Sequence, residues 1–138
     1  MARRKVRVEF EDDFGRPVVY HRHPAGGGLV SPRAHVDDTA SLARDAYVEE
    51  GAHVGAHARV GVGSWIDIDA SLDRDVVVGR NVHVGQRSNV GARARLEDGS
   101  RLGCDVIVEP DARVQPDCVI PDGAVVRRDG RRRYGIAA

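Results

Sequence analysis

Histidines are the residues of this chain best suited to acid–base chemistry, because imidazole titrates near neutral pH. A histidine that is exposed and held by a carboxylate or a carbonyl oxygen can deprotonate a hydroxyl or amine group. Among the six histidines, His83 is the first candidate for such a general base, followed by His53 and His57. His21 and His23 lie in a charged N-terminal segment, and we expect them to be solvated.

The aromatic residues suggest a second kind of site. Trp65 is the only tryptophan, with Tyr47 eighteen residues before it and His83 eighteen residues after it. Tyrosine and tryptophan are enriched where proteins contact each other. The first interpretation of Tyr47, Trp65 and His83 is therefore an interface stripe, and the second is the lining of a ligand site. Both depend on elements that bring residues eighteen apart together.

A six-residue repeat provides those elements. Every sixth residue from Val30 to Val126 is aliphatic without a slip in register, and the residue two positions earlier is always small or valine. Residues two apart lie on the same face of a strand, so each hexapeptide points one small and one branched side chain inward. A helix would need a period of about 3.6 residues. The repeat therefore predicts a solenoid of short strands that pack on their neighbours.

This pattern resembles that of the hexapeptide-repeat proteins, whose fold is a left-handed parallel β-helix with three hexapeptides per coil. The resemblance covers about residues 28–127 and implies an all-β protein of about five to six coils. It also implies that outward-facing residues eighteen apart share a face. One face then carries Tyr47, Trp65 and His83.

The other two faces differ in chemistry. One carries His35 and His53 a single coil apart, and the third is basic, with Arg59, Arg95 and Arg113. The histidine pair is a second place where a general base could stand.

The two ends of the chain depart from the repeat. By its length the chain 1–138 is one domain. Residues 1–27 alternate apolar and polar side chains around a turn and predict a hairpin, and residues 128–138 predict a second one around Asp129. Because the open ends of a solenoid expose unpaired strand edges, both segments are interpreted as caps on the β-helix of residues 28–127.

Two segments extend the resemblance to function. Residues 64–67, S-W-I-D, are similar to the V-W-I-G segment found near the acyl-coenzyme A site of hexapeptide acyltransferases, and residues 120–126 fit the family pattern I-P-x-G-x-V-V. The resemblance implies transfer of an acyl group from acyl-CoA to a small hydroxyl or amine acceptor. It also implies a homotrimer with its sites in the clefts between subunits. Trp65 and Tyr47 are the candidates for binding the co-substrate.

Departures from the family pattern support an alternative. Asp67 stands where the family has glycine, R-R-D-G-R-R-R-Y-G replaces the G-x-P-A end, and no loop interrupts the repeat. These features favour a non-enzymatic trimeric β-helix scaffold. A second alternative is a zinc protein like the γ-class carbonic anhydrases of the same family. Zinc is not expected, because two ligands in that class are five residues apart, whereas His53 and His57 are four apart.

Charge and composition limit the expected cellular compartment and the expected binding partners. The formal net charge is zero, with basic ends and an acidic middle, and no apolar run is long enough to span a membrane. The first dozen residues are charged, unlike a signal peptide, and two cysteines make no disulfide framework. The arginines near the C-terminal end have no stacking platform beside them, apart from Tyr134, so nucleic acid is not expected as a partner. The expected partners are further copies of the chain and a small molecule, in the cytoplasm.

Overall fold

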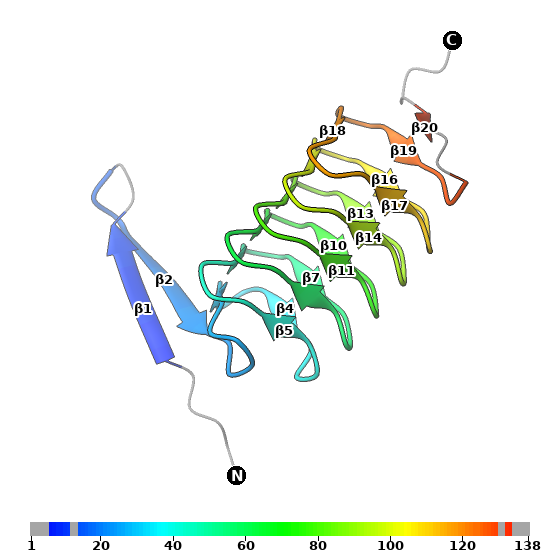
Figure 1. Ribbon diagram of the computed structural model, residues 1–138. Helices are drawn as coiled ribbons and strands as arrows, with labels where there is room; N and C mark the ends of the chain where they lie inside the picture. The colour runs from blue at the N-terminus through cyan, green and yellow to red at the C-terminus, as the bar shows by residue number, and fades with distance from the viewer. Residues whose placement is uncertain (1–5, 12–13, 130–131, 134–138) are drawn as a thin grey trace.

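The computed structural model describes residues 6–11, 14–129 and 132–133. Within these residues the chain is all β, and its strands stack in parallel from coil to coil to form a solenoid (Figure 1). The prediction of an all-β parallel solenoid is confirmed. The described residues contain no helix that could cross a membrane.

The strands form three sheets that run along the solenoid, which we call sheets A, B and C. In spatial order, sheet A contains β1 (Val6–Glu11), β2 (Pro17–Arg22), β3 (Leu29–Val30), β6 (Tyr47–Val48), β9 (Trp65–Ile66), β12 (His83–Val84), β15 (Arg101–Leu102) and β18 (Val119–Ile120). Sheet B contains β20 (Arg132–Arg133), β19 (Val125–Val126), β16 (Ile107–Val108), β13 (Asn89–Val90), β10 (Ser71–Leu72), β7 (His53–Val54) and β4 (His35–Val36). Sheet C contains β17 (Arg113–Val114), β14 (Arg95–Leu96), β11 (Val77–Val78), β8 (Arg59–Val60) and β5 (Ser41–Leu42).

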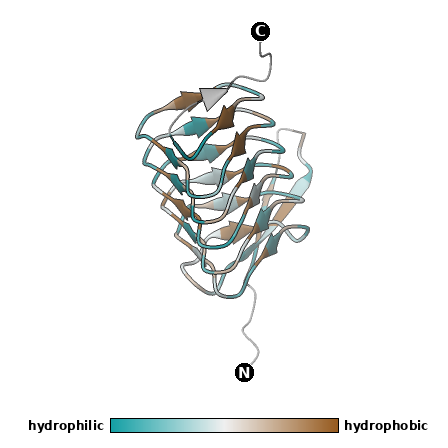
Figure 2. Ribbon diagram, turned by 90° about the vertical axis from the view of Figure 1, so that its right-hand side faces the viewer, coloured by the Kyte–Doolittle hydropathy of each residue, from teal (hydrophilic) through white to brown (hydrophobic). Residues whose placement is uncertain are grey.

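The second residue of each two-residue strand from β3 to β19 belongs to the core or packs against it. From Leu42 onward the aliphatic residues of the repeat are buried to within a few per cent, and the small residues between them fill the rest of the interior. From β4 to β19 the first residue of each strand is at least partly exposed, and it is polar in some strands and apolar in others (Figure 2). Burial of this continuous aliphatic column is the main stabilising term of the fold.

Register between coils is eighteen residues throughout the parallel pairs. Tyr47 pairs with Trp65, Trp65 with His83, and His83 with Arg101 along sheet A. His35 pairs with His53 in the same way on sheet B. The predicted columns of outward residues are therefore present.

The corners between strands share a backbone feature, a positive φ at one fixed position. The residue three positions after the aliphatic residue has a positive φ at every corner from Asp45 to Gly123. Left-handed backbone favours glycine and tolerates Asp, Asn and His better than β-branched residues, and Asp, Asn and Gly hold most of these positions. The corner at Thr39 is an exception and has no positive φ.

Glycines allow the coils to stack closely. A Cβ atom on Gly61 would overlap the carbonyl oxygen of Gly79, and one on Gly85 would overlap that of Gly103. These positions lie directly after the buried aliphatic residue, where one coil meets the backbone of the next. Glycine at them is required by space.

Antiparallel strands occur at both ends of the stack. β1 and β2 form the predicted N-terminal hairpin, and β2 continues sheet A by pairing with β3 (Figure 1). At the other end β20 pairs antiparallel with β19 on sheet B. The turn predicted around Asp129 includes Gly130, which lies outside the described residues, and the boundaries of the caps stay predictions.

One expectation about the hairpin region is wrong. His23 is buried rather than solvated, because its Nε2 atom lies 2.8 Å from the carbonyl oxygen of Ala40 inside the first coil. The His23 backbone also accepts and donates hydrogen bonds in the turn with Gly27 and Gly28. His23 thus closes the N-terminal mouth of the solenoid.

Candidate functional site

The aromatic stripe of sheet A is positioned by three consecutive strands. β6, β9 and β12 each present their first residue outward, so Tyr47, Trp65 and His83 lie in one row. Two acids, Glu49 and Asp67, directly follow the buried residues of β6 and β9. The strands fix the row, and the corners that follow them bring carboxylates to its side.

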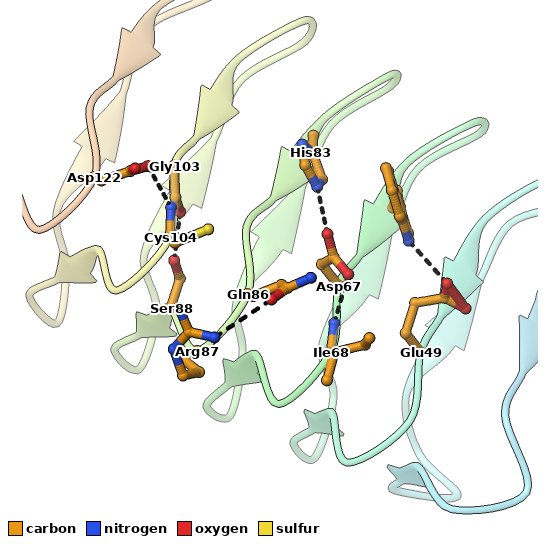
Figure 3. A network of polar contacts seen from close by, with 11 residues as sticks. Glu49, Asp67, Ile68, His83, Gln86, Arg87, Ser88, Gly103, Cys104 and Asp122 are labelled. Atoms are coloured by element: carbon orange, nitrogen blue, oxygen red, sulfur yellow. Dashed lines mark hydrogen bonds and ion pairs between the residues drawn. The ribbon is translucent and has the colours of Figure 1, made fainter.

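His83 is held by Asp67. The Nε2 atom of His83 lies 3.0 Å from Oδ2 of Asp67, whose other oxygen accepts a 2.7 Å hydrogen bond from the backbone N–H of Ile68 (Figure 3). The Asp67 side chain is only 9% exposed, whereas that of His83 is 29% exposed. An orienting carboxylate behind a partly accessible imidazole is the arrangement that general-base catalysis requires.

The tautomer of His83 follows from this contact. An ionised carboxylate only accepts hydrogen bonds, so the neutral imidazole carries its proton on Nε2 and keeps a lone pair on Nδ1. Within the described part of the chain, Nδ1 of His83 makes no hydrogen bond. The lone pair on Nδ1 is therefore free to take a proton from a bound acceptor.

Trp65 packs on the imidazole from the preceding coil. The two ring centroids are 4.4 Å apart and the planes are 14° from parallel. The indole Nε1–H of Trp65 donates a 3.2 Å hydrogen bond to Oε2 of Glu49. An aromatic face stabilises a cation stacked on it, so Trp65 favours the imidazolium form that a base reaches after accepting a proton.

Glu49 also connects the stripe to the hairpin. Its Oε1 atom accepts a 2.7 Å hydrogen bond from the hydroxyl of Tyr20 on β2. The Tyr20 ring packs edge-on against Tyr47 at 5.6 Å and against Phe10 of β1 at 5.9 Å. Burial and the hydrogen bond to Glu49 raise the pKa of Tyr20 well above its ordinary value of 10.0, so this hydroxyl keeps its proton and donates it.

Sheet B carries a separate pair of imidazoles. The rings of His35 and His53 stack with centroids 4.9 Å apart and planes 18° from parallel. They border an open hollow of about 650 Å³ on this face. The hollow is lined by Ala34, His35, Val36, Asp37, His53, Val54, Gly55, Ser71, Leu72 and Asp73.

The acid nearest in sequence to this pair is turned away from it. Oδ1 of Asp37 accepts hydrogen bonds from the backbone N–H and the hydroxyl of Thr39, at 2.9 and 2.6 Å. Neither His35 nor His53 has a hydrogen bond to a carboxylate within the residues that the structure describes. This pair therefore lacks an orienting group.

The structure separates the three predicted base candidates. His83 lies beside Trp65 and Asp67 on sheet A, and His53 lies beside His35 on sheet B. His57 is a corner residue with a φ of 58°, and its backbone N–H donates to the hydroxyl of Thr39. Tyr47 and Trp65, the candidates for the co-substrate, belong to the same row as His83.

Sequence reasoning missed Asp67 as the partner of His83 and Glu49 as the partner of Trp65. A signal was available in the spacing, because each acid follows a buried aliphatic residue and precedes its partner by sixteen residues. Counting coils identifies the outward column but assigns no direction to a corner side chain. In the sequence, Asp67 stands out only as a departure from the family glycine.

No metal centre is evident in the part of the chain that the structure covers. Within residues 6–11, 14–129 and 132–133, no three His, Cys, Asp or Glu side chains gather in a way that could hold a metal ion.

Comparison with known proteins places the fold. No protein-family model matches the sequence, and no curated protein is significantly similar to it. Among solved structures, a mutant of AntD, an N-acyltransferase from Bacillus cereus in complex with dTDP and coenzyme A, has a TM-score of 0.61 at 14% identity. That match covers 78% of this chain and 80% of AntD.

Two further structures are similar over part of their length. The acetyltransferase domain of PglB from Neisseria gonorrhoeae, in complex with acetyl coenzyme A, is 25% identical with a TM-score of 0.41, over 72% of this chain and 54% of that one. A mutant of GDP-perosamine N-acetyltransferase from Caulobacter crescentus, in complex with CoA and GDP-perosamine, is 25% identical with a TM-score of 0.39, over 75% and 54%. The chain thus spans about half the length of each of these two proteins.

The chain has the hexapeptide-repeat β-solenoid fold, as the sequence resemblance implied. The AntD structure matches this fold over most of both chains.

Proposed function

We propose that this protein is an acyltransferase that moves an acyl group from acyl-CoA to an amine or hydroxyl group of a small acceptor. The observation that carries the proposal is the Asp67–His83 pair, a partly exposed imidazole held at 3.0 Å by a buried carboxylate. Fold similarity alone does not fix chemistry, so the site has to support the assignment.

His83 acts as the general base in this proposal. Its Nδ1 atom takes the proton of the acceptor N–H or O–H as the acceptor nitrogen or oxygen bonds to the thioester carbonyl carbon. The carbon–sulfur bond then breaks, CoA leaves as a thiolate with the electron pair, and the sulfur takes the proton from Nδ1 to give the free thiol. Asp67 stabilises the imidazolium in between, and Trp65 stabilises it from the stacked face.

Two sources support acyl-CoA as the co-substrate. The S-W-I-D segment that resembles the family's acyl-CoA segment holds Trp65 and Asp67 of the site. AntD, which has the same fold, is described as an N-acyltransferase in complex with dTDP and coenzyme A. A nucleotide-linked amino sugar is accordingly the first acceptor class to screen.

A homotrimer is part of this proposal. His83 stands on an outward strand face with Arg101 as its register partner in the next coil, and in this proposal an adjacent subunit supplies further walls of the site. Phe14 is 81% exposed and Val119 is 69% exposed, and both belong to the side of the molecule that sheet A forms or extends. Their exposure also favours the second candidate function, a trimeric scaffold without catalysis.

The test is titration calorimetry of the purified protein with acetyl-CoA, with native mass measured in parallel. The proposal expects a trimer that binds about one ligand per subunit, followed by CoA release when amino-sugar nucleotides are added. Absence of binding at millimolar acetyl-CoA, with the trimer intact, would overturn the transferase and leave the scaffold. Binding without turnover on any acceptor would assign a ligand site only.

A further inference from the structure

One cross-coil contact recurs in this solenoid at a fixed spacing. The acid that follows a buried aliphatic residue accepts a hydrogen bond from the outward side chain sixteen residues later. The three cases are Glu49 with Trp65, Asp67 with His83, and Glu97 with Arg113. Each contact joins the end of one strand to the start of its neighbour in the next coil of the same sheet.

On sheet A two of these contacts occur in consecutive coils, so the two rings that they hold lie next to each other. Glu49 fixes the indole of Trp65, Asp67 fixes the imidazole of His83, and the two fixed rings stack on each other at 4.4 Å. The rings restrain each other only because both are held at the edge by an acid. On sheet C the Glu97–Arg113 contact has no such neighbour.

The indole needs this restraint because it is exposed. Trp65 is 42% exposed, and packing alone leaves such a side chain other rotamers. The hydrogen bond to Glu49 selects one rotamer, and Tyr20 in turn holds Glu49 from the hairpin. The rotamer of Trp65 thus depends on contacts from the corner after β6 and, through Glu49, from β2.

The groups that face His83 are few. Asp67 holds it from the corner after β9, Trp65 covers one ring face, and Arg101 is its register partner on the other side. Removing the indole would leave the hydrogen bond to Asp67 as the contact that orients the ring.

We propose that Glu49 and Trp65 are positioning residues for His83. Glu49 sets the plane of the Trp65 indole, and the indole keeps the His83 ring oriented with Nε2 on Asp67 and with Nδ1 toward the acceptor. An effect of Glu49 and Trp65 on catalysis rests on the proposed function, whereas their effect on the orientation of the His83 ring rests on the contacts alone. It assigns the N-terminal hairpin a part in the site through Tyr20.

The test uses four variants and one matched control in the full chain. Glu49→Ala removes the acceptor for both donors, Glu49→Gln keeps the shape, Trp65→Phe keeps a ring but loses the N–H, and Trp65→Leu loses both. Glu97→Gln is the control, because it changes the same contact with the same spacing on sheet C. The three substituted residues, Glu49, Trp65 and Glu97, have partly or fully exposed side chains, and circular dichroism and elution volume report whether each of the five variants keeps its fold.

The first readout needs no activity. The nitrogen-15 shifts of the His83 imidazole report how far the Nε2–H tautomer predominates, and the ring current of Trp65 shifts the signal of the His83 Hε1 proton. We expect Glu49→Ala and Trp65→Leu to move both signals toward those of a free, mixed-tautomer histidine, with Trp65→Phe and Glu49→Gln intermediate. Glu97→Gln should leave them unchanged. Unchanged His83 signals in Glu49→Ala and Trp65→Leu would overturn the proposal.

The second readout separates this inference from the proposed function. If the protein transfers acyl groups, Glu49→Ala and Trp65→Leu should lower kcat about tenfold, whereas Glu49→Gln lowers it less. A wild-type protein without activity whose His83 signals respond as expected would reject the function and retain the positioning. An active enzyme whose kcat and His83 signals are unchanged by the Glu49 and Trp65 variants would retain the proposed function and reject the positioning role.

Discussion

Sheets A and B both have an acid sixteen residues before a histidine, but the acid bonds that histidine only on sheet A. Asp67 precedes His83 by sixteen residues, and Asp37 precedes His53 by the same number. On sheet A the acid bonds the histidine at 3.0 Å. On sheet B the acid bonds Thr39, and the histidine stacks on His35 instead.

The corner residue two positions after the acid explains the difference. Thr39 offers a hydroxyl that reaches Asp37, whereas the equivalent residue after Asp67 is Asp69, which has no hydrogen to donate when ionised. The backbone follows the same division, because Asp69 has a φ of 59° and Thr39 has no positive φ. A β-branched residue resists the left-handed conformation, so its presence changes the turn and supplies the competing donor together.

The largest effect expected from this comparison is on catalysis. His83→Ala should lower kcat/KM for acyl transfer by about 10²- to 10⁴-fold, because the general base is lost. The matched variant His53→Ala on sheet B should leave kcat/KM unchanged. Steady-state kinetics on both purified variants checks this, and equal losses in the two would place the base elsewhere.

The next effect concerns the acid of each pair. Asp67→Asn should lower kcat about 100-fold with little change in KM, because the amide no longer selects the Nε2–H tautomer or stabilises the imidazolium. Asp37→Asn should not affect kcat, since Asp37 does not contact His53 in this structure. A KM effect without a kcat effect in Asp67→Asn would indicate that the pair binds substrate only.

A third experiment removes the Thr39 hydroxyl, which competes with His53 for the Asp37 carboxylate. Thr39→Val keeps the shape of the side chain but removes the hydroxyl, so Asp37 becomes free to turn toward His53. The His53 nitrogen-15 shifts should then move toward a single tautomer. Stability should fall by about 1 kcal/mol, because the hydroxyl also accepts the N–H of His57. Chemical denaturation measures that loss, and unchanged His53 shifts would count against the explanation by Thr39.

Acid titration tests the same corner through pH. Hydrogen bonds from the Thr39 hydroxyl and N–H hold the pKa of Asp37 below its ordinary value of 3.8. A carboxyl whose pKa is lower in the folded state adds stability above its unfolded pKa, and this is lost as the pH falls through the folded pKa. Nuclear magnetic resonance titration of the carboxyl carbon should show that depressed pKa in the wild type. In a Thr39→Val, His53→Ala double variant, which removes the hydroxyl and also the imidazole toward which Asp37 could turn, the midpoint should return toward 3.8. An equal midpoint in this variant and the wild type would contradict the assignment.

The smallest effect is expected at the third histidine. His57 holds a corner with a φ of 58°, which asparagine also tolerates, so His57→Asn should change stability by less than about 0.5 kcal/mol and leave kcat as it is. His57→Val should be less stable than His57→Asn by roughly 1 kcal/mol, because a β-branched residue is strained there. Thermal unfolding of the two variants gives the difference, and a kcat loss in His57→Asn would restore His57 as a candidate base.

Period and face were predictable from the sequence because they depend on the backbone. Strand geometry alone places Trp65 beside His83, since both are first residues of strands one coil apart. The direction of a corner side chain is different, because it depends on which donors lie within reach. Asp67 and Asp37 follow strands of the same kind, yet Asp67 bonds His83 and Asp37 bonds Thr39, a donor that the Asp67 corner lacks because it has Asp69 there.

The ends of the chain were harder to predict for a related reason. His23 lies outside the repeat, so no period marks it as inward, and it is buried by a contact with Ala40 that forms only when the first coil closes. The bond from Tyr20 to Glu49 likewise joins residues twenty-nine apart that no repeat relates. Regular positions follow from counting, whereas these contacts follow from packing in three dimensions.

The eighteen-residue register has a consequence for how such a molecule can change over time. The side-chain contacts that join Glu49 to Trp65 and Asp67 to His83 lie within a few adjacent coils of one subunit, and neither contact involves a residue of the coils beyond Arg101. Loss or duplication of one whole coil there, for example residues 103–120, keeps every inward residue inward. Insertion of a single residue exchanges the inner and outer faces of the strands that follow. The solenoid can therefore gain or lose whole coils of eighteen residues in evolution, while the residues around His83 keep their positions relative to one another.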